Sequence, residues 1–278
     1  CAVAYVADIT DEENRTKGMG MVGMAIGLGF IIGPAIGGLL STFSLAIPFF
    51  ASSSLALVTL FFCWVLLEES LDETKRRMKA GEPRTSRWTA VQGALKHLYA
   101  LGFIVSFTLA GLESVLQYFQ RQAFGAGPTH IGVMLLISGI VGAAIQGGII
   151  RRLVKQGMES RVIVIGLTLS AAGFFLLLAS DSFFTATVYL CVFAAGNALV
   201  RPCVTSLITQ KTKVGQGAAS GLSSSMDSLG RIAGPLFGTM LFTVDHMLPF
   251  LFCGVICLAS LFFVYRFLRQ SDAAAEAV

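Results

Sequence analysis

The stretch GMVGMAIGLGFIIGPAIGGLLSTFSLAIPF at residues 20–49 is repeated, without a gap, as GLSSSMDSLGRIAGPLFGTMLFTVDHMLPF at residues 221–250. Eleven of the thirty aligned positions are identical, far more than this composition gives by chance. Each copy contains an apolar, glycine-rich segment, a short turn and a second apolar segment. A repeat of that length, built from membrane-spanning helices, is typical of transporters assembled from two similar halves. We therefore predict a carrier.

The composition indicates a membrane protein. Of the 278 residues, 55% are hydrophobic and 13% are charged, which is about half the charged fraction of an ordinary soluble domain. Eight apolar blocks are each long enough to cross a hydrocarbon core of about 30 Å as a helix. They occupy residues 17–41, 45–67, 97–120, 131–150, 162–180, 183–208, 217–243 and 247–267. Because lipid offers the backbone no hydrogen bonds, we predict an all-α, polytopic membrane protein and exclude a soluble domain.

Lysine and arginine gather in alternate connections between these blocks, as the positive-inside rule describes. Residues 7–17, 68–96 and the C-terminus are therefore expected in the cytoplasm, and the protein in the inner (plasma) membrane of the cell. The net charge of +4 follows from this loop bias. We expect the lipid bilayer as a partner and no nucleic acid.

The repeat also predicts the organisation of the chain. Residues 1–9 align with residues 202–210, the end of the block that starts at residue 183. We therefore expect a chain that lacks the first three helices of the repeated architecture and most of the fourth. The predicted parts are the remnant of an N-terminal six-helix bundle (1–67), a cytoplasmic linker (68–94), a C-terminal six-helix bundle (95–270) and a cytoplasmic tail (271–278). The polar linker is either a solvated spacer or a regulatory segment.

The string GLGFIIGPAIGG at residues 27–38 is the most specific motif. Three of its glycines lie four residues apart on one helix face and let another helix approach closely, while its proline bends the helix. The string resembles the antiporter signature of the twelve-helix drug:proton antiporters in the major facilitator superfamily. That resemblance assigns the signature to Gly29, Gly33, Pro34, Gly37 and Gly38.

Three further stretches are similar to quinolone and multidrug efflux pumps of the NorA type: LESVLQYF at 112–119, VRPCVTS at 200–206 and QGAASGLSSSMDSLGRIAGP at 216–235. The resemblance implies two six-helix bundles with a substrate cavity between them. It also implies proton-driven export of small, amphipathic, often cationic drug-like compounds by alternating access, and hence antibiotic resistance. Protons are then the coupling ion, with no other cofactor, and we expect a monomer.

Four charged residues fall within predicted membrane helices: Glu113, Arg201, Asp227 and Arg231. A charge at membrane depth costs at least about 2.5–3.5 kcal/mol on insertion scales, so we expect these residues to face a cavity and to be functional. Glu113 matches, by resemblance, the acidic residue that such pumps use for proton coupling and for cationic drugs. A carboxylate shielded from water also takes up a proton more readily near neutral pH. The alternative is a hydrogen-bonding strut.

Arg201 and Pro202 match the family's arginine–proline dipeptide, but Ala198 stands where close relatives carry an aspartate. Arg201 has two possible roles. It either polarises the cavity, binds an anionic group of a substrate or lowers the pKa of a nearby acid, or it ties helices together through backbone carbonyls. Asp227 and Arg231 are spaced i,i+4 on one predicted helix. They form either a self-neutralising pair that locks the helix, or a site in which Asp227 replaces the absent family acid.

Further site residues are predicted less specifically. Asp8 resembles the family acid that pairs with a basic loop and would form a cytoplasmic gate. Aromatic, amide and thioether side chains are candidates to line a drug-binding cavity: Met21, Met24, Phe107, Gln117, Tyr118, Phe193 and Asn197.

Two other functions are weighed. A narrow-substrate metabolite or sugar carrier of the same superfamily would use the residue 27–38 motif for packing only. An enzyme is not expected, because no catalytic constellation occurs on one helix. The six cysteines form no CxxC pair, so we predict no metal site.

Overall fold

The structure is a computed structural model that describes residues 5, 25, 28, 29, 32–67, 95–150, 158–212 and 216–276. The predicted gate residue Asp8, the predicted cavity residues Met21 and Met24, and the linker 68–94 lie outside the described residues. The chain divides into two compact units, Cys1–Thr85 and Ser86–Val278. Their boundary falls within the segment predicted as the linker.

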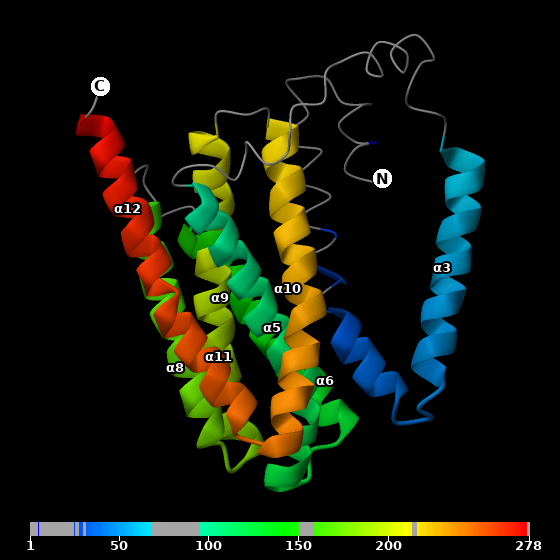
Figure 1. Cartoon of the computed structure of the whole chain (residues 1–278). Helices are drawn as coiled ribbons and strands as arrows, with labels where there is room; N and C mark the ends of the chain where they lie inside the picture. The colour runs from blue at the N-terminus through cyan, green and yellow to red at the C-terminus, as the bar shows by residue number, and fades with distance from the viewer. Residues whose placement is uncertain are drawn as a thin grey trace. The chain divides into compact units, whose positions relative to one another are not determined.

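The first unit contains a helical segment at 32–40, a turn at 41–46 and the helix α3 (Ile47–Leu66) (Figure 1). The amide of Ser41 donates to the carbonyl of Gly37 at 3.0 Å at the start of the turn. Pro48 lies in the first turn of α3, where its missing N–H costs nothing. This helix–turn–helix is what the first copy of the repeat predicts.

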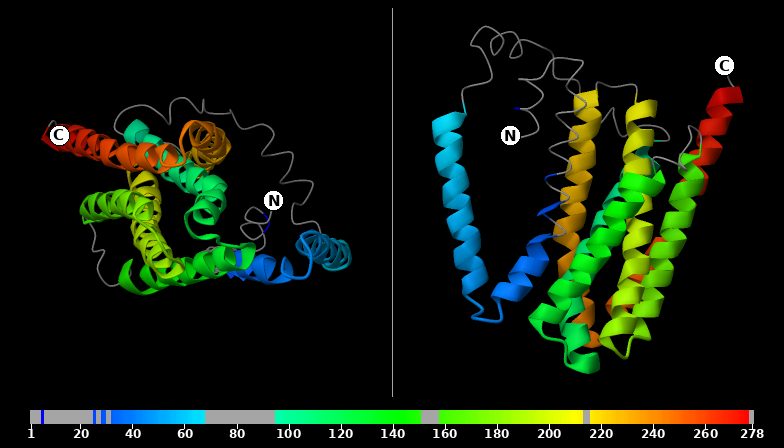
Figure 2. Two further views of the ribbon diagram at one scale, coloured as in Figure 1. Left: turned by 90° about the horizontal axis from the view of Figure 1, so that it is seen from below. Right: turned by 180° about the vertical axis from the view of Figure 1, so that it is seen from behind.

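The second unit is a helical bundle (Figures 1 and 2). Its helices, in chain order, are α5 (Leu95–Phe124), α6 (Pro128–Ala144), the π-helix η2 (Ile145–Ile149), α8 (Glu159–Leu178), α9 (Phe183–Lys211), α10 (Gln216–Val244), α11 (Leu248–Ala259) and α12 (Leu261–Glu276). No strand occurs among the residues that the structure describes.

Six of the described helical segments are long and apolar enough to cross a membrane: Ile47–Leu66, Leu95–Phe124, Pro128–Gly148, Glu159–Leu178, Phe183–Lys211 and Leu248–Gln270. Helix α10 has 29 residues, as α9 does, but it is not among the six. Its N-terminal half is rich in serine and carries Asp227 and Arg231, which lowers its hydropathy. The lower hydropathy of α10 fits a helix with one polar face.

The last predicted block, 247–267, is two helices rather than one. Helix α11 ends at Ala259 and α12 begins at Leu261. Between them the hydroxyl of Ser260 donates to the carbonyl of Cys257 at 2.6 Å, and such a local bond competes with regular helix geometry. Helix α12 continues to Glu276, beyond residue 270 where the predicted bundle ended.

Helix α5 is at the centre of the second unit and packs on α9, α10, α11 and α12 (Figure 2). Helix α9 packs between α6 and α8. Two apolar clusters fill the bundle, one around Leu101 and Val105 and the other around Leu116 and Phe119. Helix α5 contributes to both clusters, so its buried side runs the length of the core.

The close packing of α5 on α10 depends on three glycines of α10. A Cβ atom at Gly230 would lie 2.6 Å from the carbonyl oxygen of Phe103, and one at Gly238 would lie 2.9 Å from the hydroxyl of Ser114. A Cβ at Gly234 would collide with the Phe107 carbonyl. These glycines are the repeat partners of Gly29, Gly33 and Gly37. At those three positions of the first unit, a Cβ would meet no atom of the described residues within 4 Å.

Candidate functional site

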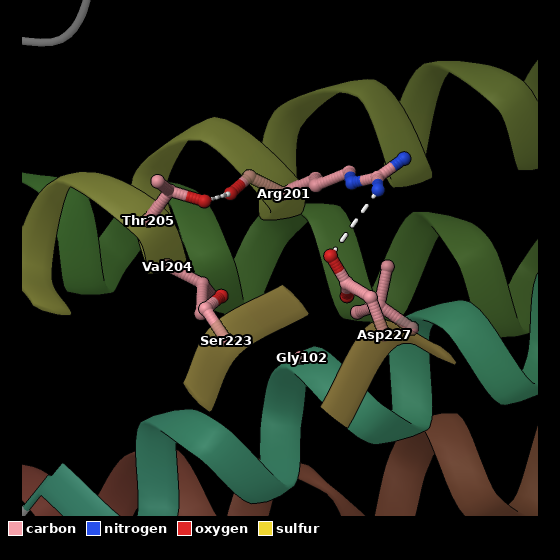
Figure 3. Close-up of a pocket in the computed structure, with 7 residues that line it drawn as sticks. Gly102, Arg201, Val204, Thr205, Ser223 and Asp227 are labelled. Atoms are coloured by element: carbon pink, nitrogen blue, oxygen red, sulfur yellow. Dashed lines mark hydrogen bonds and ion pairs between the residues drawn. The ribbon is translucent and has the colours of Figure 1, made fainter. Parts of the chain in front are cut away.

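Two of the predicted intramembrane charges form an ion pair between helices. Nη2 of Arg201, on α9, donates to Oδ2 of Asp227, on α10, at 3.3 Å (Figure 3). The Arg201 side chain is 43% exposed and the Asp227 side chain 26% exposed. The ion pair that the structure gives Asp227 is therefore with the neighbouring helix. The i,i+4 pair of Asp227 with Arg231 stays a prediction.

Asp227 has a second partner that the sequence analysis did not identify. The hydroxyl of Ser106, on α5, donates to Oδ1 of Asp227 at 2.8 Å. Ser106 is 3% exposed. It lies seven residues before Glu113, about two helical turns, so the helical period could have pointed to Ser106 on the same side of α5 as Glu113. One carboxylate thus joins three helices.

A small cavity of about 10 Å³ lies beside this carboxylate and is lined by Gly102, Val105, Arg201, Val204, Thr205, Ser223 and Asp227 (Figure 3). Its volume matches one water molecule, and the hydroxyl and carboxylate groups on its wall are the partners that a buried water needs. The Thr205 hydroxyl also donates to the Arg201 carbonyl at 3.0 Å.

The other two charges lie on the neighbouring helices α5 and α10. Glu113 is exposed on α5, and Arg231 is exposed on α10. The positive charge of Arg231 acts on the Glu113 carboxyl. On α10, Asp227 thus contacts both α9 and α5, and the charge of Arg231 acts on α5. The four charges cancel when all are ionised, which reduces the cost of holding them at membrane depth.

Both proline residues near these charges lie inside helices. Pro202 follows Arg201 in α9, and Pro235 lies four residues after Arg231 in α10. A proline lacks the N–H that would bond to the carbonyl four residues earlier. The carbonyls of Ala198 and Arg231 therefore receive no helical N–H from the proline four residues later, so α9 and α10 can bend near Arg201 and Arg231.

Ala198, where relatives were expected to carry an aspartate, is 4% exposed. A Cβ added to Gly142 of α6 would lie 3.9 Å from the Ala198 methyl group. That face of α9 thus packs on α6, and the carboxylate that Arg201 contacts comes from α10.

The predicted cavity residues divide into two groups. Phe107 and Phe193 are 6% and 2% exposed and belong to the apolar core. Phe193 packs edge-on against Phe174, with ring centroids 4.8 Å apart. A role for these two residues in a substrate cavity stays a prediction. Side chains with open surface remain at Gln117, Tyr118 and Asn197.

The described part of the antiporter motif lies in the first unit. Gly33 is exposed, Pro34 and Gly37 are half-buried, and Gly38 is buried. The carbonyl of Gly38 accepts a hydrogen bond from the Ser41 hydroxyl at 2.7 Å. That bond helps to end the helix before the turn.

Comparison with known proteins gives consistent matches along the chain. A family model described as Major Facilitator Superfamily matches residues 1–159 and 157–277. Multidrug resistance protein 2 of Bacillus subtilis (strain 168) is 34% identical over 263 residues, which cover 93% of this chain and 66% of that protein. Quinolone resistance protein NorA of Staphylococcus aureus (strain MRSA252) is 26% identical over 248 residues, covering 88% and 63%. The chain thus spans less than two thirds of the length of these relatives.

Among solved structures, the human organic anion transporter MFSD10 (TETRAN) is similar with a TM-score of 0.67 and 26% identity. The match covers 94% of this chain and 66% of that one.

Proposed function

The chain belongs to the major facilitator superfamily, and from that premise we propose that the protein exports small, amphipathic, often cationic compounds in exchange for protons. Transport proceeds by alternating access, in which two similar bundles rock around a central site. The similarity to a multidrug resistance protein, 34% identity over 93% of this chain, supports this substrate class.

The observation that carries the proposal is the balanced set of charges on α5, α9 and α10. An exposed glutamate on an apolar, 30-residue helix has no place in lipid, because a charge at that depth is costly. Glu113 therefore faces water in the substrate cavity. There it attracts a cationic substrate when it is ionised and releases that substrate when it takes up a proton.

The exchange also involves α10. When Glu113 takes up a proton, its attraction for Arg231 is lost. Arg231 then competes with Arg201 for Asp227, one turn away on α10. Substrate release and the contact between α9 and α10 are coupled in this way, and the family acid absent at Ala198 is replaced by Asp227.

The experiment is ethidium efflux from energised cells that express the protein as its gene encodes it. We expect efflux that collapses with a protonophore, and a loss of at least about tenfold in Glu113→Gln, because the neutral amide cannot exchange a proton. The matched control is Asp181→Asn, since Asp181 lies in the connection before α9 and bonds Thr185 there. Normal efflux in E113Q would reject the proton role of Glu113.

A second candidate is export of organic anions, favoured by the similarity to the organic anion transporter structure and by the exposed side chains of Arg201 and Arg231. The same cells loaded with an anionic dye, such as a carboxyfluorescein, separate the two. Efflux of the anion without ethidium efflux supports the second candidate. Failure with both dyes indicates the narrow-substrate metabolite or sugar carrier.

A further inference from the structure

We propose that Ser106 of α5 is a positioning residue for Asp227. Its hydroxyl orients the carboxylate and thereby controls which oxygen takes up and releases a proton. The inference rests on the proposed function, in which Asp227 takes part in proton-coupled export. It adds one hydroxyl group of α5 to the four charges predicted from the sequence.

The choice of partner distinguishes Ser106 from the other hydroxyl residues of α5. Hydroxyl groups inside helices usually donate to a carbonyl three or four residues earlier. Thr108 does so to Ile104 at 2.9 Å, and Ser114 does so to Gly111 at 2.7 Å. Ser106 instead donates across the helix interface to Oδ1 of Asp227. Its hydroxyl is therefore used to orient the carboxylate rather than to satisfy its own helix.

The surroundings make this contact specific. A Cβ added to Gly230 of α10 would lie 2.9 Å from the Cβ of Ser106, so the missing side chain at Gly230 lets Ser106 lie directly against α10. One added to Gly102 of α5 would lie 3.9 Å from Oδ1 of Asp227. The two glycines leave room for the Asp227 carboxylate at the α5–α10 interface.

The two oxygens of the carboxylate have different donors. Oδ1 accepts from Ser106, a neutral hydroxyl, while Oδ2 accepts from Arg201, a permanent cation. Arg231 is the other charged residue near it, one turn further along α10. A proton on Oδ2 would face the N–H of Arg201, which can only donate, whereas a proton on Oδ1 leaves Oδ2 free to accept from Arg201. The geometry directs the proton to the Oδ1 side, where Ser106 must yield or reverse its hydrogen bond.

The cavity beside the carboxylate gives that proton a route. It has the volume of one water molecule and includes Thr205 and Ser223 on its wall. A water bound there would carry the proton between Asp227 and the hydroxyl groups toward the N-terminal end of α5. Ser106 thus holds the carboxylate at the edge of a hydrated site.

The test uses four variants of the protein as its gene encodes it: Ser106→Ala, Asp227→Asn, the double variant, and Ser114→Ala as the control. S106A keeps the Cβ that contacts Gly230, so the α5–α10 packing is retained. S114A removes a hydroxyl from the same helix that bonds only to its own backbone. Transport is read as ethidium–proton exchange in proteoliposomes, and proton binding as the infrared difference spectrum of carboxyl groups after a pH step.

We expect D227N to remove one carboxyl band, S106A to shift that same band, and S114A to leave it in place. S106A should slow exchange by about tenfold, the size of losing a hydrogen bond to a charged group. In the D227N background S106A should add less than about twofold, because interacting residues are not additive. An unshifted band in S106A, or an equal loss in both backgrounds, overturns the inference.

The infrared result also separates this inference from the proposed function. If the protein moves no ethidium but the D227N-sensitive band shifts in S106A, the proposed substrate class fails while the Ser106–Asp227 relation stands. If ethidium is exported with proton exchange and S106A behaves as S114A does, the inference fails while the proposed function stands.

Discussion

Arg201 donates to one oxygen of Asp227 from the neighbouring helix. We expect removal of one partner to harm folding and expression more than removal of both charges. In Arg201→Gln, the Asp227 carboxylate keeps its charge but loses its cation. Exchange of ethidium for protons should fall by at least about tenfold, because an uncompensated charge at membrane depth is costly. Adding Asp227→Asn removes that charge, so the double variant should recover protein folding and expression, measured by size-exclusion profile, although not transport. A double variant that is as poorly expressed as R201Q would contradict the pairing.

At the residue scale, the sequence identified the charges but not their partners. Glu113, Arg201, Asp227 and Arg231 stand out because charges are rare in apolar blocks. Their pairing depends on which helices pack together, and the i,i+4 spacing of Asp227 and Arg231 gave no indication that Asp227 also pairs with Arg201 of α9. Ser106 was missed because a serine in a membrane helix bonds its own backbone in most settings.

At the scale of the elements, the α5–α10 contact makes a stability prediction. In Gly234→Ala, the new methyl group would meet the Phe107 carbonyl and the Gly111 amide, and backbone atoms cannot move aside as a side chain can. We expect a loss of about 1–3 kcal/mol from overpacking, only partly offset by the better helix propensity of alanine. Gly221→Ala is the control, because a Cβ there meets nothing within 4 Å. Melting temperatures in detergent should fall for G234A and not for G221A, and equal values would reject the contact.

The apolar pattern predicted where the helices lie more accurately than it predicted where each helix begins and ends. The predicted block 183–208 is α9, Phe183–Lys211, and the block 217–243 is α10, Gln216–Val244. The break at Ser260 was missed because the apolar pattern continues through it, and Ser260, whose hydroxyl bonds the Cys257 carbonyl, is a residue found inside helices as well. Hydropathy measures the preference of a segment for lipid and carries no information about such a local bond.

For the whole molecule, the family and the all-α, multi-pass membrane fold predicted from the sequence are confirmed by the family match and by the six apolar helices. Both follow from physics that acts on every residue, since lipid excludes unpaired backbone groups. The internal repeat added the prediction of two similar halves. Which helix of a bundle contacts which could not be read from the pattern, because hydropathy identifies a membrane helix and does not specify its neighbours.

The orientation of the molecule in the membrane is also a prediction. A green fluorescent protein fused after Val278 should fluoresce, and alkaline phosphatase fused there should be inactive, because the basic connections are expected in the cytoplasm. Insertion at Asp181, between α8 and α9, is the control and should give the reverse pattern. Active phosphatase at Val278 would invert the topology.

The cancellation of the four charges has a consequence for energy supply. With Glu113, Arg201, Asp227 and Arg231 all ionised, these groups carry no net charge through the electric field of the membrane when access changes sides. A single bound proton leaves one unit of positive charge, and moving that charge across 100 mV is worth about 2.3 kcal/mol. Under the proposed exchange, the unprotonated carrier that holds a monovalent cationic substrate also carries one positive charge, so the membrane voltage acts alike on the two loaded forms and barely on the empty, unprotonated one.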